Sequence, residues 1–341
     1  MMMHRAVSIQ NDTVSSFGRA WLRTPSYDLI LIAGVFTCAI LLGSIATVSY
    51  NLFMLVVYAD FWLLAPPHVI STYTRIAFDR TSAKRYWFLL AGLPPLVLIA
   101  TASLAWVGGA IALNTLYFIW QTWHYTRQSH GIARAYRRTA LPGISGHDHL
   151  TEFVIFGVPT WGILHRAYQQ PVEFFGNPIW CIELPEVLIT AMGFVVLCVV
   201  LTWFCRLAFF RNQVGHNLFV ISHVAITIVG YYLIDDITFG WLFINIWHNA
   251  QYLLFVWAYN NRRFRAGIED AHPIISWMSQ SGREYHYAYI CVGLGVVFYC
   301  LLMAGASLIT WQVLPMILIA YQTVTFHHYI VDSVIWRTSA G

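Results

Sequence analysis

The segment from Phe326 to Arg337 places two adjacent histidines and an aspartate within an otherwise apolar and aromatic stretch. In a helix, His328 and Asp332 are one turn apart and share a face, whereas His327 points about 100° away. Imidazole is the commonest metal ligand in proteins. Ionisable side chains are expensive inside a membrane and usually mark function there. The segment therefore predicts metal chemistry if the chain is a membrane protein.

Three further histidines lie in similar apolar surroundings. His68 follows Pro66 and Pro67, which should break the helix just before it. His124 and His248 each lie in a stretch rich in aromatic residues. The polar residues near these histidines are the expected outer partners that orient the imidazole rings: Gln121, Gln128, Asn245, Gln251 and Tyr252.

Two other histidines are additional candidates for a metal or its surroundings. His130 lies six residues after His124, so it reaches the same centre only if the helix unwinds at Gly131. His223 shares a helical face with His216, seven residues earlier, and the pair could ligate a metal or haem. The alternative is that each simply hydrogen-bonds within a bundle.

The composition indicates the class of protein that carries these residues. Of the 341 residues, 58% are hydrophobic and only 10% are charged, whereas soluble domains carry about 25% charged residues. An all-α, polytopic membrane bundle is expected, with a cytoplasmic segment at 1–27 and one transmembrane domain at 28–341. Ten apolar stretches are long enough to cross a bilayer: 29–49, 51–74, 86–107, 109–128, 151–168, 186–206, 215–234, 238–259, 286–306 and 309–333.

The basic residues fix the expected orientation. With ten spans, every Lys and Arg except Arg166 falls on one side of the membrane, and acidic residues such as Glu183 and Asp235 fall on the other. The positive-inside rule then places both termini in the cytoplasm. The excess of basic charge therefore reflects topology and anionic lipid rather than nucleic-acid binding. A bacterial inner membrane is the expected location.

This topology aligns the histidines. The candidate metal ligands all fall on even-numbered spans, in the cytoplasmic third of each: His68, His124, His248, His327 and His328. Helical bundles build metal sites from side chains on facing helices. Several imidazoles with a carboxylate suit iron, copper or zinc, and the absence of Cys and Met from this layer weakens a copper reading.

The order of the motifs resembles the Brp/Blh family of membrane β-carotene 15,15'-dioxygenases. Pro67-His68 is similar to the first histidine motif of that family, and Trp123-His124 is similar to the second. The segment from Trp247 to Tyr252 is similar to the third, with Tyr252 in place of a second histidine. His327 with Asp332 five residues later is similar to the fourth.

The resemblance implies an iron oxygenase. Fe(II) held by about four imidazoles would leave a position for dioxygen, and a hydrophobic substrate would reach it laterally from the lipid bilayer. Copper and zinc are less expected. Aromatic residues near the histidines are the expected walls of the substrate pocket: Trp120, Trp123, Trp247, Phe326 and Tyr329.

Other functions fit parts of the pattern. His130, His328 and Asp332 could complete a second metal position, which would favour a dinuclear hydroxylase or desaturase, although the HxxxH and HxxHH boxes of membrane desaturases are absent. A haem electron carrier would need two facing histidines. A transporter would favour inverted repeats with broken helices in corresponding positions, and the proline pairs of the second and third spans are not symmetric partners.

Overall fold

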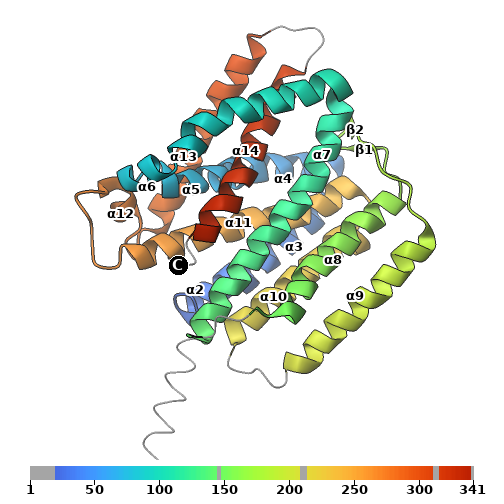
Figure 1. Cartoon of the computed structure of the whole chain (residues 1–341), viewed down its shortest axis with the longest axis horizontal. Helices are drawn as coiled ribbons and strands as arrows, with labels where there is room; N and C mark the ends of the chain where they lie inside the picture. Colours follow the sequence, from blue (N-terminus) through green and yellow to red (C-terminus); the bar gives the residue numbers. More distant parts are fainter. Residues whose placement is uncertain (1–19, 144–146, 208–212, 310–314, 339–341) are drawn as a thin grey trace, which may run out of the picture.

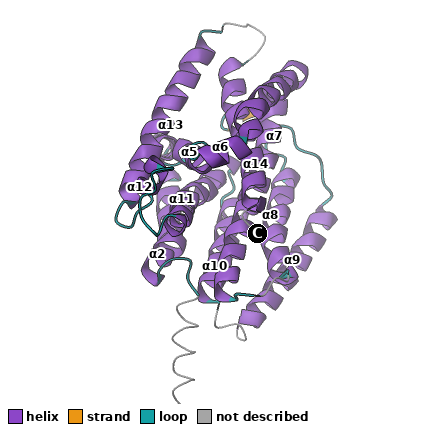
Figure 2. Ribbon diagram, turned by 60° about the vertical axis from the view of Figure 1, so that its left-hand side comes forward, coloured by secondary structure: helices purple, strands orange, loops and turns teal. Residues whose placement is uncertain are grey.

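The computed structural model describes residues 20–143, 147–207, 213–309 and 315–338. Long helices pack side by side, and within those ranges the only strands form a two-residue antiparallel ribbon near the bend of α7 (Figures 1 and 2). The all-helical prediction is therefore confirmed. The elements are α2 Pro25–Leu29, η1 Ile30–Gly34, α3 Val35–Ala46, α4 Tyr50–Leu63, α5 Ala65–Ile76, α6 Arg80–Arg85, η2 Phe88–Gly92, α7 Leu93–Ala140, α8 His149–Tyr168, β1 Glu173–Phe174, β2 Asn177–Pro178, α9 Glu186–Leu207, α10 Val214–Ile228, η3 Val229–Leu233, α11 Ile237–Arg263, α12 Pro273–Met278, α13 Glu284–Ser307 and α14 Met316–Thr338.

Within the described part of the chain, six helical segments are long and apolar enough to cross a membrane. These segments are Pro25–Ala46, Tyr50–Ile76, Phe88–Ala140, Glu186–Leu207, Val214–Leu233 and Glu284–Ser307. A membrane protein is thus the class that the structure supports. Each of the ten predicted stretches overlaps a helix, although part of the last one, at 310–314, lies outside the described residues.

Helix α7 is sharply bent at Gly109 (Figure 1). Gly109 has φ +64° and ψ −165°, a conformation that side chains with a Cβ rarely adopt. The bend falls between the predicted stretches 86–107 and 109–128. Beyond it, the helix continues to Ala140, so the unwinding at Gly131 that would bring His130 to the centre does not occur.

The predicted break before His68 is present. Helix α4 ends at Leu63, Leu64 leaves the helical conformation, and α5 begins at Ala65 with the prolines in its first turn. Proline is tolerated there because the first backbone N–H groups of a helix have no intrahelical partner. Gly295 of α13 allows close approach, since a Cβ there would lie 3.0 Å from Pro66 Cβ. The break fixes His68 in the first turn of a buried helix.

Helix α11 runs through the interior. Its N-cap Asp236 accepts hydrogen bonds from the backbone N–H groups of Thr238 and Phe239, which replace bonds that the first turn cannot make internally. Most of its side chains from Leu242 to Tyr252 are buried. The helix therefore offers its polar residues to other helices rather than to lipid.

Arg166, the exception in the charge pattern, is almost completely buried. Its guanidinium donates to the backbone carbonyls of Gly230, Ile234 and Asp235, at the end of η3. These carbonyls lack helical partners, and the arginine satisfies them. Arg166 thus serves the fold and is not a loop charge that reports orientation.

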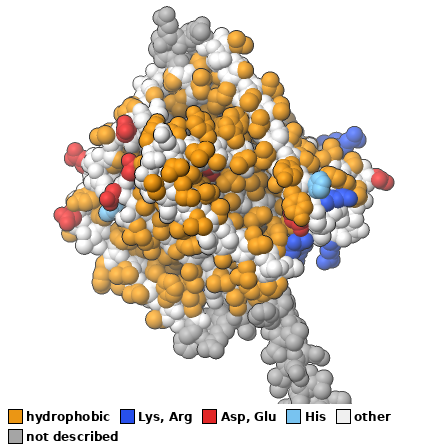
Figure 3. Space-filling view, turned by 180° about the vertical axis from the view of Figure 1, so that it is seen from behind, with side chains coloured by type: hydrophobic (Ala, Val, Ile, Leu, Met, Phe, Trp, Pro, Cys, Tyr) orange, Lys and Arg blue, Asp and Glu red, His pale blue; other side chains and the backbone are white. Residues whose placement is uncertain are grey.

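One face of the molecule is covered mainly by hydrophobic side chains, with acidic side chains gathered at one edge and basic side chains at the opposite edge (Figure 3). Exposed apolar residues such as Val107, Val187 and Leu301 would be unfavourable in water and are suited to lipid. The two charged edges agree with the separation of charge expected from the sequence. Which edge faces the cytoplasm stays a prediction.

Candidate metal centre

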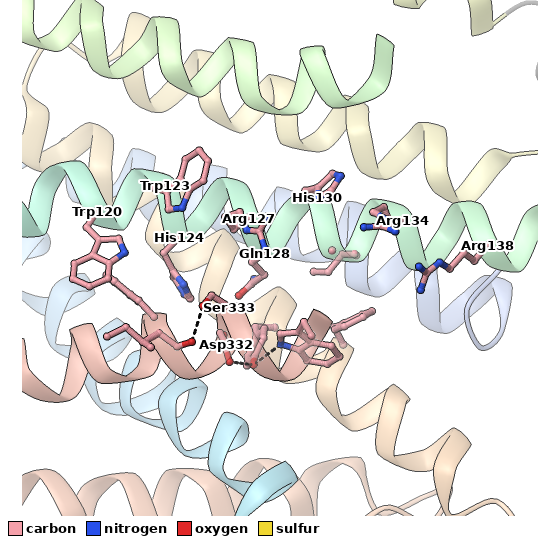
Figure 4. A pocket seen from close by; sticks show the side chains of 17 residues that line it. Trp120, Trp123, His124, Arg127, Gln128, His130, Arg134, Arg138, Asp332 and Ser333 are labelled. Carbon is pink, nitrogen blue, oxygen red and sulfur yellow. Dashed lines mark hydrogen bonds between the residues drawn. The ribbon is translucent and has the colours of Figure 1, made fainter. Parts of the chain in front are cut away.

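Four histidines from four helices meet in the interior. His68 of α5, His124 of α7, His248 of α11 and His328 of α14 are all buried. The ring of His68 lies 4.7 Å from the rings of both His248 and His328, and the ring of His124 lies 5.0 Å and 4.8 Å from the same two rings. Figure 4 shows His124 directed from α7 toward α14. We call these four residues the histidine cluster.

Part of this cluster has the geometry of a metal site. One ligand atom from each of His68, His124, His328 and Asp332 lies within 4.8 Å of the others. The Nε2 atoms of His68 and His328 are 2.8 Å apart, and Asp332 Oδ2 lies 3.7 Å from His328 Nε2. His248 stands beside this set.

Buried polar atoms in the cluster lack hydrogen-bond partners among the described residues. They include His124 Nε2, His248 Nδ1 and His68 Nδ1, and Oδ2 of the adjacent Asp332 also lacks a partner. Leaving buried polar atoms unpaired is costly, and such atoms call for a partner such as an ion or water. A cavity of about 40 Å³ is lined by all four histidines. Imidazole nitrogens with one carboxylate oxygen form a donor set that suits iron, copper or zinc, so these residues fit a metal ion.

Thr72 orients one of the candidate ligands. Its hydroxyl donates to Asp332 Oδ1 at 2.9 Å and lies 3.1 Å from His328 Nδ1. Because the hydroxyl hydrogen goes to the carboxylate, we assign His328 Nδ1–H as the donor to Thr72 Oγ1. This tautomer leaves the Nε2 lone pair of His328 facing the cluster. Outer partners of this kind commonly fix metal-binding imidazoles.

Tyr252 holds the carboxylate. Its hydroxyl donates to Asp332 Oδ1 at 2.6 Å and accepts a hydrogen bond from Trp336 Nε1 at 3.1 Å. Its ring packs 4.3 Å from the ring of His68. The predicted role of Tyr252 around the centre is thus matched by direct contacts with His68 and Asp332.

A second polar chain lies beside the cluster. Gln121 donates to the hydroxyl of Tyr125, Tyr125 donates to Asn245 Oδ1, and Asn245 donates to Asp60 Oδ2. The ring of Tyr125 packs 4.0 Å from His248. Gln121 and Asn245 therefore support the cluster through Tyr125 instead of bonding the imidazoles, and Asp60 bonds a neighbouring helix.

Gln128 and Gln251 do not orient an imidazole either. Gln128 donates to the backbone carbonyl of His248 at 3.1 Å. The amide of Gln251 is completely buried and has no hydrogen-bond partner within the described ranges; nothing in the structure explains this.

His327 does not join the cluster, so its assignment as a ligand is wrong in this structure. Its Nε2–H donates to the backbone carbonyl of Leu89 at 2.7 Å, and its Nδ1 accepts from the Tyr73 hydroxyl at 2.6 Å. His327 lies on a different face of α14 from His328, and there both of its ring nitrogens are hydrogen-bonded. Helical geometry, which pairs His328 with Asp332, decides between the adjacent histidines.

His130 is also excluded from the cluster. Since α7 continues past Gly131, His130 faces α8, where its Nε2 lies 3.3 Å from Glu152 Oε1. His147 and His149 contact the same carboxylate, at 2.9 and 3.5 Å. The contribution of His130 to a second metal in the cluster is therefore not supported by its position.

His223 and His216 are structural in their contacts. His223 Nε2 bonds the carbonyl of Ile155 and His216 Nδ1 bonds the carbonyl of Ala133. Trp247 packs against Phe219 and His223 in the main core. The prediction that Trp247 lines a substrate pocket is wrong, because Trp247 is buried in the core and lines neither the 480 Å³ cavity nor the 280 Å³ groove beside the centre.

A cavity of about 480 Å³ opens beside the centre and reaches His124 and Asp332 (Figure 4). The predicted wall residues Trp120, Trp123 and Tyr329 line it. Phe326 lines an adjoining apolar groove of about 280 Å³. Four of the five predicted wall residues therefore do line a cavity or groove.

Thr72 and Tyr125 were not anticipated from the sequence. Thr72 follows His68 by four residues and so shares its helical face. Tyr125 is adjacent to His124 and contacts a different helix, which a spacing argument could not reveal.

Comparisons of the chain with protein-family models, with curated proteins and with solved structures find no significant match.

Proposed function

We propose that this protein is a membrane-embedded, non-haem iron oxygenase that uses dioxygen to oxidise a hydrophobic substrate. The observation that carries the proposal is the convergence of His68, His124, His328 and Asp332 beside a cavity, with buried donor atoms that lack partners. His248 is a further donor at the edge of this set. An iron ion bound there would supply the capacity to activate dioxygen.

The residues around the centre have separate tasks in this proposal. Thr72 keeps His328 in the tautomer whose Nε2 is unprotonated. Tyr252 holds Asp332 by Oδ1, which leaves Oδ2 for the metal. Trp120 and Tyr329 form apolar walls of the adjacent cavity. Apolar walls reduce the access of water, which limits side reactions.

Several contacts favour one ion over two and disfavour haem. His130, which the predicted second ion would need, is held by Glu152. His327, which could otherwise have supplied an extra imidazole, is held by Leu89 and Tyr73. The space of about 40 Å³ among the histidines accommodates an ion with a few water molecules but not a porphyrin.

We further propose ten membrane passes with the basic edge in the cytoplasm of a bacterial cell. A straight helix as long as α7 would span about 72 Å, far more than the roughly 30 Å of a bilayer core, and the bend at Gly109 divides it. Helices α11 and α14 carry polar site residues and α8 carries Glu152 and Arg166, which lowers the hydropathy of all three helices. Accessibility of single cysteines introduced at Arg138 and Glu183 tests the sidedness: labelling of both from the same side would contradict it.

Metal analysis tests the function. Protein expressed without a histidine tag and purified in neutral detergent should contain about one iron per chain. His124→Ala should lose the iron, whereas His149→Ala, whose side chain is exposed at the surface, should retain it. A folded, metal-free wild-type protein or a haem absorption band would overturn the proposal. Substrate-dependent oxygen consumption by the iron-loaded protein would then establish the reaction.

A further inference from the structure

The large cavity has an uneven distribution of charge. It lies between the second half of α7 and the side chains of α11 and α14. Arg127, Arg134 and Arg138 line it from α7, and Figure 4 shows them following one another along that helix, beyond His124. Asp332 is the only carboxylate in the lining. The cavity therefore combines a basic end with an end at the candidate metal centre.

The spacing of the arginines puts them on one helical face. Arg134 and Arg138 follow Arg127 by seven and eleven residues, which correspond to about two and about three helical turns. The stripe is about 16 Å long. Oδ1 of Asp332 does not pair with these arginines, because it accepts hydrogen bonds from the hydroxyls of Thr72 and Tyr252. Arginine recognises carboxylates and phosphates through paired hydrogen bonds, so this end of the cavity favours an anion.

The opposite end continues into an apolar groove. The groove of about 280 Å³ lies between the two halves of α7 and α14, and it shares Trp120 and Ile330 with the cavity. The rings of Trp120 and Phe326 stack 4.9 Å apart where the two spaces adjoin. Leu96 and Leu116 of the groove are exposed on the outside of the bundle. A hydrocarbon chain could therefore pass from the bilayer into the groove.

We propose that this composite site binds a long-chain amphiphile with an anionic head. The carboxylate or phosphate head lies at Arg134 and Arg138, the middle of the chain passes His124, and the tail occupies the groove. Along α7, the distance from Arg138 to Trp120 is about 27 Å, which is comparable to the bilayer core and suits a long chain. The binding claim stands on the cavity alone. The claim that this ligand is the substrate rests on the oxygenase proposed above.

Equilibrium binding tests the charge at the head. The protein is reconstituted in phosphatidylcholine nanodiscs, and radiolabelled palmitate, hexadecyl phosphate and hexadecanol are compared after subtraction of protein-free discs. Palmitate or hexadecyl phosphate should bind at least about tenfold more tightly than hexadecanol, and the tighter of the two identifies the head. Equal affinity for all three would overturn the proposal.

Matched variants separate the cavity from the general basic edge. The double variant Arg134→Gln/Arg138→Gln should lose about tenfold or more in affinity for the preferred anion. Arg262→Gln/Arg265→Gln removes the same charge from exposed positions at the end of α11, outside the cavity lining, and should bind like wild type. Equal losses in both variants would reduce the effect to surface charge and overturn the proposal.

A third variant tests the position of the tail. Ala100→Phe narrows the groove and should weaken the binding of a 26-carbon fatty acid more than that of palmitate, which is too short to reach the groove from the arginines. Equal effects would refute this placement. Iron content is measured in the same samples. Anion binding by iron-free wild-type protein would support the amphiphile site and refute the oxygenase proposal. Bound iron without anion binding would support the oxygenase proposal and refute the amphiphile site.

Discussion

Replacing His328 and His327 one at a time separates ligation from packing within two adjacent residues. His328 presents Nε2 to the candidate centre, 2.8 Å from His68 Nε2, whereas both nitrogens of His327 are bonded to Tyr73 and Leu89. Because loss of an outer partner already weakens metal binding by about 10–100-fold, His328→Ala should lose its metal during purification.

The effect of His327→Phe should be of another kind. Phenylalanine keeps a flat ring against Tyr73, with which His327 is stacked at 5.9 Å, but it removes two hydrogen bonds. At roughly 0.6–1 kcal/mol each, the free energy of unfolding should fall by about 1–2 kcal/mol. The metal content should remain that of the wild type.

The assay pairs elemental analysis of the purified variants with thermal unfolding in the same detergent. Size-exclusion profiles verify that each variant is folded. If His327→Phe were metal-free while His328→Ala retained metal, the ligand assignment drawn from the geometry of α14 would be wrong.

Three other perturbations follow from the structure. Thr72→Val should lower metal affinity by about 10–100-fold because the His328 Nδ1–H loses its acceptor, whereas Thr72→Ser should bind normally in a metal titration. Burial raises the pKa of Asp148, but the hydrogen bonds and charge of Arg206 and the bonds from Thr151 outweigh it and lower that pKa to about 2, below the ordinary value of 3.8. This carboxylate should therefore contribute about 2 kcal/mol above pH 4 that is lost as the pH falls toward 2, and Asp148→Asn, which still caps α8, should lack that part of the acid sensitivity in pH-dependent unfolding. Gly109→Ala should lower the free energy of unfolding by about 1–3 kcal/mol, because φ +64° with ψ −165° is a conformation confined essentially to glycine, although a Cβ would meet no neighbour within 4 Å; an unchanged melting temperature would contradict this.

Much of the scaffold could be predicted from the sequence because its causes are local. Apolar runs of membrane length, the proline pair before His68 and the shared face of His328 and Asp332 all follow from composition or from the helical repeat. The break at Leu64 confirms the effect of the prolines. The bend at Gly109 likewise falls where the predicted stretches were divided.

The tertiary structure decided which of the histidines share a centre. Spacing along one helix gives direction about its axis but not which neighbour lies opposite, so it could not show that His327 meets Tyr73 or that His130 meets Glu152. The same limit concealed Thr72, whose partners lie on α11 and α14. Sequence alone determined that imidazoles lie within apolar helices; the packing of four helices determined which nitrogens face one another, because that depends on contacts between residues far apart in the chain.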